Sequence, residues 1–368
     1  MGGYVSLPTH SILETMKAKT LWVLLLIFGL FISGCTPKEK TPLVVFAAGS
    51  LIQPFDDLEQ AFEIKYPDID VQSEYHGSIQ VIRHVTELHE GIDIVASADQ
   101  ALIPMLMYQV NIPDTNKPYA NWYISMAGNR LALAYNPESK YAQEINADNW
   151  YEVLSRPDVK VGLSDPRFDA VGYRQLMTFA LAQGVYDNTG IFNAFLDDQF
   201  THRIRLVDMG DMQIIRIPEL LETTRTSHIM MRGSSVALIS LLEAGEIDYA
   251  FEYESVIQQH GFEMLKLPPS LNLGEDGMED QYGKVTVKMD FQRFASVDPV
   301  FKGEKIKYGL TIPSNAPHPE EAALYIQFLY SQEGQAIMQQ NMHPLLIPVI
   351  VDKPENLPEL IQENLPLE

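Results

Sequence analysis

The chain has almost no cysteine and is short of positive charge. Cys35 is the one cysteine in 368 residues, which excludes a disulfide within the chain, thiol catalysis deeper in the chain and cysteine-based metal centres. Lys and Arg number 26 against 49 Asp and Glu, for a net charge of −23. A surface of this sign argues against nucleic acid as a partner.

Motifs of enzymes and of resident metal ions are also missing. The nine histidines form neither a His-Glu-x-x-His motif nor a two-histidine pattern of metal-ligand spacing. Ser50 or Ser78 could act as a nucleophile, with His76 two residues before Ser78, but neither serine stands in a Gly-x-Ser-x-Gly turn. We therefore expect a protein that is not an enzyme and has no cofactor.

The N-terminal region has the pattern of a secretory signal. Lys17 and Lys19 precede an apolar run over residues 21–32, and Ser33-Gly34-Cys35 follow it. The Ser-Gly-Cys ending resembles a lipobox, in which cleavage leaves a lipidated Cys35 at the start of the mature chain. A single membrane anchor is the alternative, although the run is short for a span. We expect a signal peptide over residues 1–35, with Met1 or Met16 as the start, and a tether over 36–41. The mature protein would be an extracytoplasmic, membrane-anchored lipoprotein.

The first mature segment predicts a strand that turns into a helix. Residues 43–48 are a continuous apolar run, Gly49-Ser50 follow, and apolar residues at helical spacing begin at Phe55. Ser50 could simply cap the helix. Alternatively, the free N–H groups of the helix start could bind an anion.

The same arrangement recurs along the chain. A predicted strand over residues 69–75 leads through Gly77-Ser78 into a helical pattern, and a third strand spans 92–96. Later, residues 164–172 link a strand to a helix, and Gly233-Ser234-Ser235 precede another helix before a strand at 249–253. Strands that alternate with helices predict an α/β fold with mainly parallel sheets. The four helix starts would face one another at the carboxyl edges of these sheets, which suits a small anion.

Six segments together resemble the molybdate/tungstate-binding proteins of ABC importers, in particular the archaeal-type subgroup. They read FAAGSL, YHGSIQVIRHVTEL, DIVASAD, SDPRFDAVGYRQLM, LLEAGEIDYAFEYESVIQQHG and YGLTIP. The resemblance extends in order from about residue 44 to 348. The C-terminal stretch IPSNAPHPEEAALYIQFLYSQEGQAIM is similar to the closing helices of many extracellular solute-binding proteins.

The resemblance implies a two-lobed periplasmic-binding-protein fold of type II, whose lobes close on a ligand between them. We expect the chain to cross between lobes near residues 120–130 and 250–256. Lobe one would then comprise residues 42–124 and 254–368, and lobe two residues 125–253.

The same resemblance implies the ligand groups. Ser50 and Ser78 match hydroxyl donors of lobe one, and Tyr253 matches a hydroxyl donor on the second crossing. Val171 and Ser235 match backbone N–H donors of lobe two. Asp169 and Ser235 match positions where the subgroup brings an aspartate and a glutamate to the metal of the oxyanion. Asp169 is therefore either a direct ligand of Mo or W or a helix cap.

Serine in place of that glutamate favours a tetrahedral, hydrogen-bonded complex, because a carboxylate beside a dianion is costly unless it bonds the metal or is protonated. The alternatives are another ligand in the same fold, namely phosphate, sulfate or Fe(III). Asp169 could accept the proton of a monobasic phosphate.

The expected partners are the permease subunits and, through the lipid, the membrane; the protein itself is expected to be a monomer. Arg174 is expected in a surface or inter-lobe ion pair.

Overall fold

The computed structural model describes residues 1–4, 39–290 and 299–368. The chain divides after Thr41 into two units, and residues 42–368 form the second unit, to which the following description applies. Residues 5–35 of the expected signal peptide, with the lipidated Cys35, and residues 36–38 of the tether lie outside the described residues. No helix in the described part of the chain combines the length and the apolar character that a membrane crossing requires.

Fifteen described strands form three mixed sheets. The first sheet has the order β15-β4-β14-β3-β1-β2: Leu345–Val351, Ile124–Gly128, Lys307–Thr311, Ile94–Ser97, Thr41–Ala48 and Ile69–His76. The second has the order β11-β5-β10-β6-β9: Glu263–Lys266, Leu131–Tyr135, Tyr249–Tyr253, Val161–Ser164 and Ile229–Arg232. The third has the order β13-β12-β8-β7: Val300–Lys302, Val285–Met289, Gln213–Ile217 and Arg205–Asp208.

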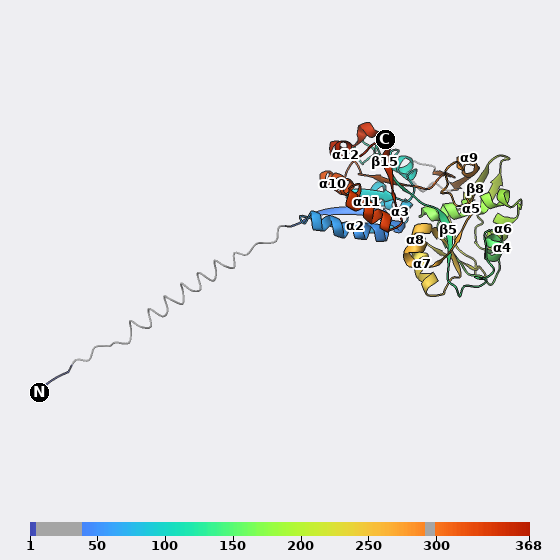
Figure 1. Ribbon diagram of the computed structural model, residues 1–368, viewed down its shortest axis with the longest axis horizontal. Coiled ribbons are helices and arrows are strands. Elements are labelled where there is room, and N and C mark those ends of the chain that lie inside the picture. The colour runs from blue at the N-terminus through green and yellow to red at the C-terminus, as the bar shows by residue number, and fades with distance from the viewer. Residues whose placement is uncertain (5–38, 291–298) are drawn as a thin grey trace. The chain divides into compact units, whose positions relative to one another are not determined.

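The helices fall into two groups (Figure 1). We call the first sheet and its helices lobe one. Its helices are α2 (Ile52–Lys65), α3 (Ser78–Thr86), α10 (Pro319–Leu329), α11 (Gln332–Gln340) and α12 (Glu359–Asn364). Its short helical turns are η1 (Gly49–Leu51), η2 (Ile103–Met107) and η3 (Pro354–Asn356). We call the other two sheets and their helices lobe two. Its helices are α4 (Trp150–Leu154), α5 (Ala170–Val185), α6 (Ile191–Leu196), α7 (Val236–Glu243), α8 (Glu254–His260) and α9 (Glu279–Tyr282).

The predicted strand-to-helix units are present. β1 pairs in parallel with β3, and β6 pairs in parallel with β9 and β10, so the carboxyl ends of these strands lie along common edges. Antiparallel pairs arise where the chain reverses, as in β10 with β5 and β14 with β3. The predicted α/β class with mixed sheets is thus confirmed.

Helix α5 forms the core of lobe two. It packs against β6 and β10 of the second sheet and also against β8 and β12 of the third sheet. A helix that is covered on all sides must be almost wholly apolar, and the stretch Leu176 to Ala182 is apolar except for Thr178, whose hydroxyl donates to Leu271 O. Its N-terminus is therefore held rigidly at the edge of both sheets.

The second crossing differs from the prediction. The first crossing lies between the end of β4 and the start of β5, as expected, although β4 itself belongs to the first sheet. After β10, however, the chain remains in lobe two. β11 pairs with β5, placing Leu265 opposite Leu133, and β12 pairs with β8. The strands β11, β12 and β13, whose residues the sequence analysis assigns to lobe one, therefore belong to the sheets of lobe two, because β11 covers the edge of β5 and β12 pairs with β8.

Phe62 of α2 provides a test of the lobe-one core. Its fully buried ring lies 5.0 Å from that of Tyr325 and 5.6 Å from that of Phe328, centroid to centroid. We expect Phe62→Ala to lower the free energy of unfolding by about 3–5 kcal/mol, because it leaves a cavity. Urea titration measures this, with Ile64→Ala on the exposed face of the same helix as the control. Equal costs for the two variants would contradict the packing described.

Candidate functional site

Ser50 lies in the η1 turn directly after β1 and is 4% exposed. Neither η1 nor α2 has a side-chain cap in the described structure, so capping does not account for this serine. Its Oγ lies 2.8 Å from Tyr308 Oη. Tyr308 Oη also accepts a hydrogen bond of 3.2 Å from Asn129 Nδ2. The Tyr308 proton is therefore available to Ser50, and the Ser50 proton is left for another acceptor.

Ser78 is the first residue of α3 and is fully buried. Its Oγ accepts a hydrogen bond of 3.0 Å from the backbone N–H of Ala98, which follows β3. A protein donor thus occupies the hydroxyl oxygen of Ser78, so its hydroxyl proton is free to be donated.

Asp169 is the N-cap of α5, and it does more than cap. Its Oδ1 accepts from Ala170 N at 2.8 Å, while its Oδ2 accepts from Ser164 Oγ at 2.7 Å and from Ser235 N at 2.9 Å. The carboxyl thus ties the start of α5 to the start of α7. Burial raises its pKa, although these three hydrogen bonds favour the ionised form.

Val171 and Ser235 lie at these two helix starts. Val171 is the second residue of α5, so its N–H lies in the first turn, where a helix offers no internal acceptor. Ser235 is the N-cap residue of α7, but its hydroxyl makes no capping hydrogen bond in the described structure. The Ser235 N–H, which the resemblance assigns to the ligand, instead donates to Asp169. Its hydroxyl remains as a donor.

Tyr253 ends β10, is 1% exposed, and its Oη accepts a hydrogen bond of 2.5 Å from Arg174 Nη1. The pKa of Tyr253 is raised well above its usual value, chiefly by burial, so the phenol keeps its proton. Since Arg174 donates to the oxygen, the Tyr253 proton is also available to an outside acceptor.

Arg174 joins the two lobes from a buried position. Besides Tyr253, it donates to Ala98 O at 2.8 Å, and its Nη2 lies 3.2 Å from Asp99 Oδ2. Tyr173 Oη donates to the same Asp99 carboxylate. Of the two ion pairs considered for Arg174, the inter-lobe one is therefore correct, and it is buried.

Five of the six predicted residues belong to one closed ring of contacts, and the sixth, Val171, follows Asp169 by two positions in α5. Gly77 and Gly49 bring the lobes together: a Cβ on Gly77 would lie 2.5 Å from Phe168 O, and one on Gly49 would lie 2.9 Å from Val236 Cγ2. The ring runs in order through Ser50, Tyr308, Tyr253, Arg174, Ala98, Ser78, Gly77, Phe168, Asp169, Ser235, Val236 and Gly49.

Glu252 is a member of this neighbourhood that the sequence analysis missed. It is fully buried, its Oε1 accepts from Tyr253 N at 2.7 Å, and its Oε2 has no partner in the described structure. Its pKa is raised to about 8, chiefly by burial and also by the nearby charge of Asp169, while hydrogen bonds from Tyr253 N and the Ser235 side chain act in the opposite direction. The sequence does contain a signal for Glu252, because a charged residue inside the otherwise apolar strand YAFEY is costly to bury and does not help to pack the strand.

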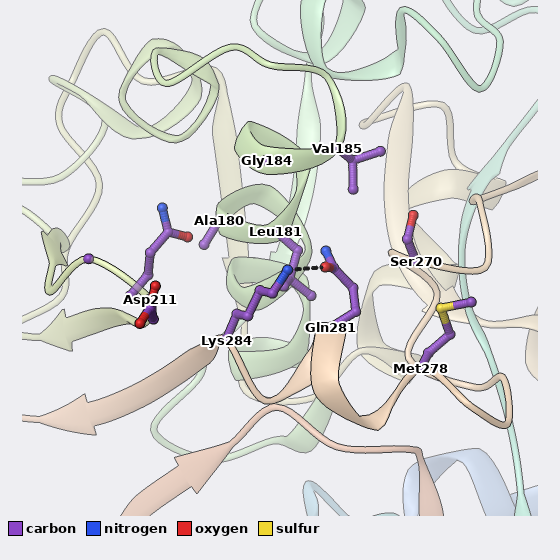
Figure 2. Close-up of a pocket in the computed structure, with 11 residues that line it drawn as sticks. Ala180, Leu181, Gly184, Val185, Asp211, Ser270, Met278, Gln281 and Lys284 are labelled. Atoms are coloured by element: carbon purple, nitrogen blue, oxygen red, sulfur yellow. Dashed lines mark hydrogen bonds between the residues drawn. The ribbon is translucent and has the colours of Figure 1, made fainter.

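Several pockets of the described structure lie outside the ring. One, of about 440 Å³, is lined by the C-terminal part of α5 together with Asp211, Gln281 and Lys284 (Figure 2). None of the six predicted residues lines it, so it is not the candidate site. Another, of about 360 Å³, borders the ring at Gly49 and Val236. Within the described residues, no cluster of three or more His, Cys, Asp or Glu side chains could hold a resident metal ion.

Glu252 makes the stability of the ligand-free protein depend on pH. Its pKa is about 8 in the folded state and near 4.5 as an ordinary glutamate. Between these values the folded state holds a proton that the unfolded state has lost, so stability falls as the pH rises. We expect Glu252→Gln to gain stability relative to the wild type over this range, by up to about 1.4 kcal/mol per pH unit. Denaturant titrations at several pH values measure it, and a difference that does not change with pH would contradict the assignment.

Comparison with known proteins places the chain in a family. Residues 43–341 match the family described as bacterial extracellular solute-binding protein. An uncharacterized solute-binding protein from Staphylothermus marinus is 38% identical over 323 residues, covering 86% of this chain and 87% of that protein. The molybdate/tungstate-binding protein WtpA from Thermococcus kodakarensis is 32% identical over 368 residues, covering 94% and 97%.

Solved structures show the same fold at low sequence identity. The sulfate-binding protein SubI from Mycobacterium tuberculosis matches with a TM-score of 0.52 and 13% identity, over 84% of this chain and 88% of that one. The predicted type II periplasmic-binding-protein fold is confirmed. The relatives are solute-binding proteins, so the expectation that the chain is not an enzyme is also confirmed. The chain belongs to the bacterial extracellular solute-binding protein family, and it is an extracytoplasmic solute-binding protein of the ABC-transporter type.

Proposed function

We propose that this protein captures molybdate or tungstate between its lobes and delivers it to an ABC importer. The observation that carries the proposal is the buried ring, in which the hydroxyls of Ser50, Ser78 and Tyr253 each accept a hydrogen bond from the protein or can do so. Their protons are then left for a ligand. A small dianion that loses its water shell needs such donors from all sides.

The charges of the protein support local recognition rather than long-range attraction. A net charge of −23 repels an anion at a distance, so binding must come from fixed donors at short range. Val171 adds an N–H at the start of α5, where the helix dipole also favours negative charge. Arg174 adds a buried positive charge one hydrogen bond away from the ligand position, through Tyr253.

Fe(III) fits this site less well. Iron binders of this fold use ionised tyrosine pairs, whereas burial holds the pKa of both Tyr253 and Tyr308 above the usual value. Neutral phenols are hydrogen-bond donors, as an oxyanion requires. The 32% identity to a protein named as a molybdate/tungstate binder supports the same choice.

Phosphate is the second candidate, and Glu252 is the reason. A site for monobasic phosphate needs an acceptor for the proton of the anion. Both Asp169 oxygens already accept hydrogen bonds, so the acceptor would be the unpartnered Oε2 of Glu252, and only in the ionised form of that carboxyl, which prevails above its pKa of about 8. The same occupancy of Asp169, together with serine at position 235, favours a tetrahedral oxyanion held by hydrogen bonds over a direct bond from Asp169 to Mo or W.

The remaining parts of the proposal concern location and partners. We propose that cleavage before Cys35 leaves a lipidated cysteine that anchors the protein outside the cytoplasm, next to its permease. The protein would act as a monomer and would need no cofactor besides its cargo.

A thermal-shift screen tests the function directly. Molybdate, tungstate, sulfate, phosphate and Fe(III) are added separately to the purified mature chain, because a ligand that binds only the folded state raises the melting temperature. We expect molybdate and tungstate to give the largest shifts. A larger shift with phosphate would favour the second candidate, and no shift with either metal oxyanion would reject the proposal.

Removing one hydroxyl donor should weaken binding. We expect Ser50→Ala and Ser78→Ala each to cost about 1–3 kcal/mol of molybdate binding free energy, because one bond to a desolvated oxygen is lost. Titration calorimetry measures the effect. Ser73→Ala is the matched control, since the Ser73 hydroxyl donates to Glu59 on a different part of lobe one. Unchanged affinity in both site variants would place the ligand elsewhere.

Gly77 should control closure of the lobes. Its φ of −62° suits alanine, but a Cβ would lie 2.5 Å from Phe168 O across the lobe boundary. We expect Gly77→Ala to lower molybdate affinity about tenfold or more, since overpacking typically costs about 1–3 kcal/mol. The free energy of unfolding without ligand should change little, because the open form avoids the contact. Gly184→Ala, where a Cβ meets open space, is the control. Wild-type affinity in Gly77→Ala would contradict this contact.

A further inference from the structure

A continuous line of polar contacts runs from Ser50 to a buried histidine at the junction of the lobes. Beyond Tyr308, Asn129 Nδ2 lies 2.8 Å from Ser255 Oγ, and Ser255 Oγ lies 3.3 Å from His343 Nε2. Asn129 stands between β4 and β5, where the chain first crosses, and Ser255 lies in the first turn of α8 in lobe two. The line therefore reaches from the ligand hydroxyl of lobe one to the crossing and to lobe two.

The neutral form of His343 fixes the direction of the first hydrogen bond. Its Nδ1 lies 3.0 Å from Asn341 O, and because a carbonyl only accepts, Nδ1 carries the proton. Burial lowers the pKa of His343 to about 4, so the ring is neutral at ordinary pH and Nε2 is an acceptor. Ser255 must therefore donate its proton to His343.

The backbone fixes the direction of the next two bonds. Arg130 N donates to Asn129 Oδ1 at 2.9 Å, so the amide oxygen faces the backbone and the amide nitrogen faces both Ser255 and Tyr308. Asn129 thus donates to both hydroxyls. With its oxygen already accepting from Asn129, Tyr308 can donate its own proton to Ser50, and this direction leaves the Ser50 proton without an acceptor in this line.

We propose that His343, Ser255, Asn129 and Tyr308 are positioning residues that direct the hydroxyl proton of Ser50 toward the bound oxyanion. This inference rests on the proposed function. It adds that the direction of the Ser50 hydroxyl is fixed by hydrogen bonds that begin at the crossing between the lobes. The direction of the Ser78 hydroxyl is fixed by the backbone N–H of Ala98 and does not depend on those hydrogen bonds.

Asn129→Asp reverses the line without changing its shape. One oxygen of the introduced carboxylate still accepts from Arg130 N, and the other faces Ser255 and Tyr308 as an acceptor. Tyr308 then donates to this carboxylate and accepts from Ser50, so the Ser50 proton turns away from the ligand.

The experiment is a set of double-mutant cycles on the mature chain, with molybdate affinity measured by calorimetry. Asn129→Asp is compared in the wild type, in Ser50→Ala and in Ser78→Ala. The added negative charge affects molybdate binding alike in all three backgrounds. The Ser50 hydroxyl proton, however, is present only in the wild type and in Ser78→Ala. We expect Asn129→Asp to weaken molybdate binding roughly tenfold or more in the wild type and in Ser78→Ala. In Ser50→Ala we expect the loss of affinity caused by Asn129→Asp to be smaller by a factor of at least about five.

A second pair of variants guards against misfolding. His343→Leu removes the acceptor for Ser255, while His343→Gln can keep one near the position of Nε2. We expect weaker molybdate binding for Leu than for Gln, with similar melting temperatures without ligand. Equal effects of Asn129→Asp in all three backgrounds, or equal affinities for Leu and Gln, would overturn the inference. Failure of the wild type to bind molybdate would instead contradict the proposed function.

Discussion

The buried guanidinium of Arg174 is the interaction on which the rest of the site depends. A desolvated charge is tolerated only when its partners are complete, and Arg174 finds them on both lobes: Asp99 and Ala98 O on one side, Tyr253 on the other. Breaking such an arrangement leaves a buried charge uncompensated. The lobes are thus held at a defined separation, and the phenol of Tyr253 is turned so that its proton remains available.

A common rule links the donors of the ring. Each hydroxyl that we propose as a ligand donor is next to a protein group that donates to it or can do so: Tyr308 for Ser50, Ala98 N for Ser78, and Arg174 for Tyr253. The two carboxyl groups in or near the ring, those of Asp169 and Glu252, instead have their negative charge compensated or removed. Asp169 is saturated by three donors, and burial keeps Glu252 largely protonated near neutral pH. In the proposed complex, donors would therefore face the oxyanion while negative charge is neutralised behind them, in a protein that is strongly acidic overall.

Local sequence patterns predicted the strand-to-helix turns, because glycine and serine after an apolar run report backbone geometry directly. The turns at Gly49-Ser50 and Gly77-Ser78 are where the sequence placed them, and the resemblance selected six residues that the fold brings together. Long-range pairing was not readable. The Arg174–Asp99 ion pair and the second crossing depend on which strand covers which edge, and β11 carries too short a pattern to show it. Glu252 was visible in the apolar strand but was not interpreted.

In the proposed complex a compact dianion replaces its water shell with the donors of this ring. Anomalous diffraction at the molybdenum absorption edge, on crystals grown with molybdate, locates the bound metal. We expect one strong peak between the lobes, within oxyanion hydrogen-bonding reach of Ser50, Ser78, Val171 N and Tyr253. A peak at another place on the protein, or no peak in crystals grown with molybdate, would contradict it.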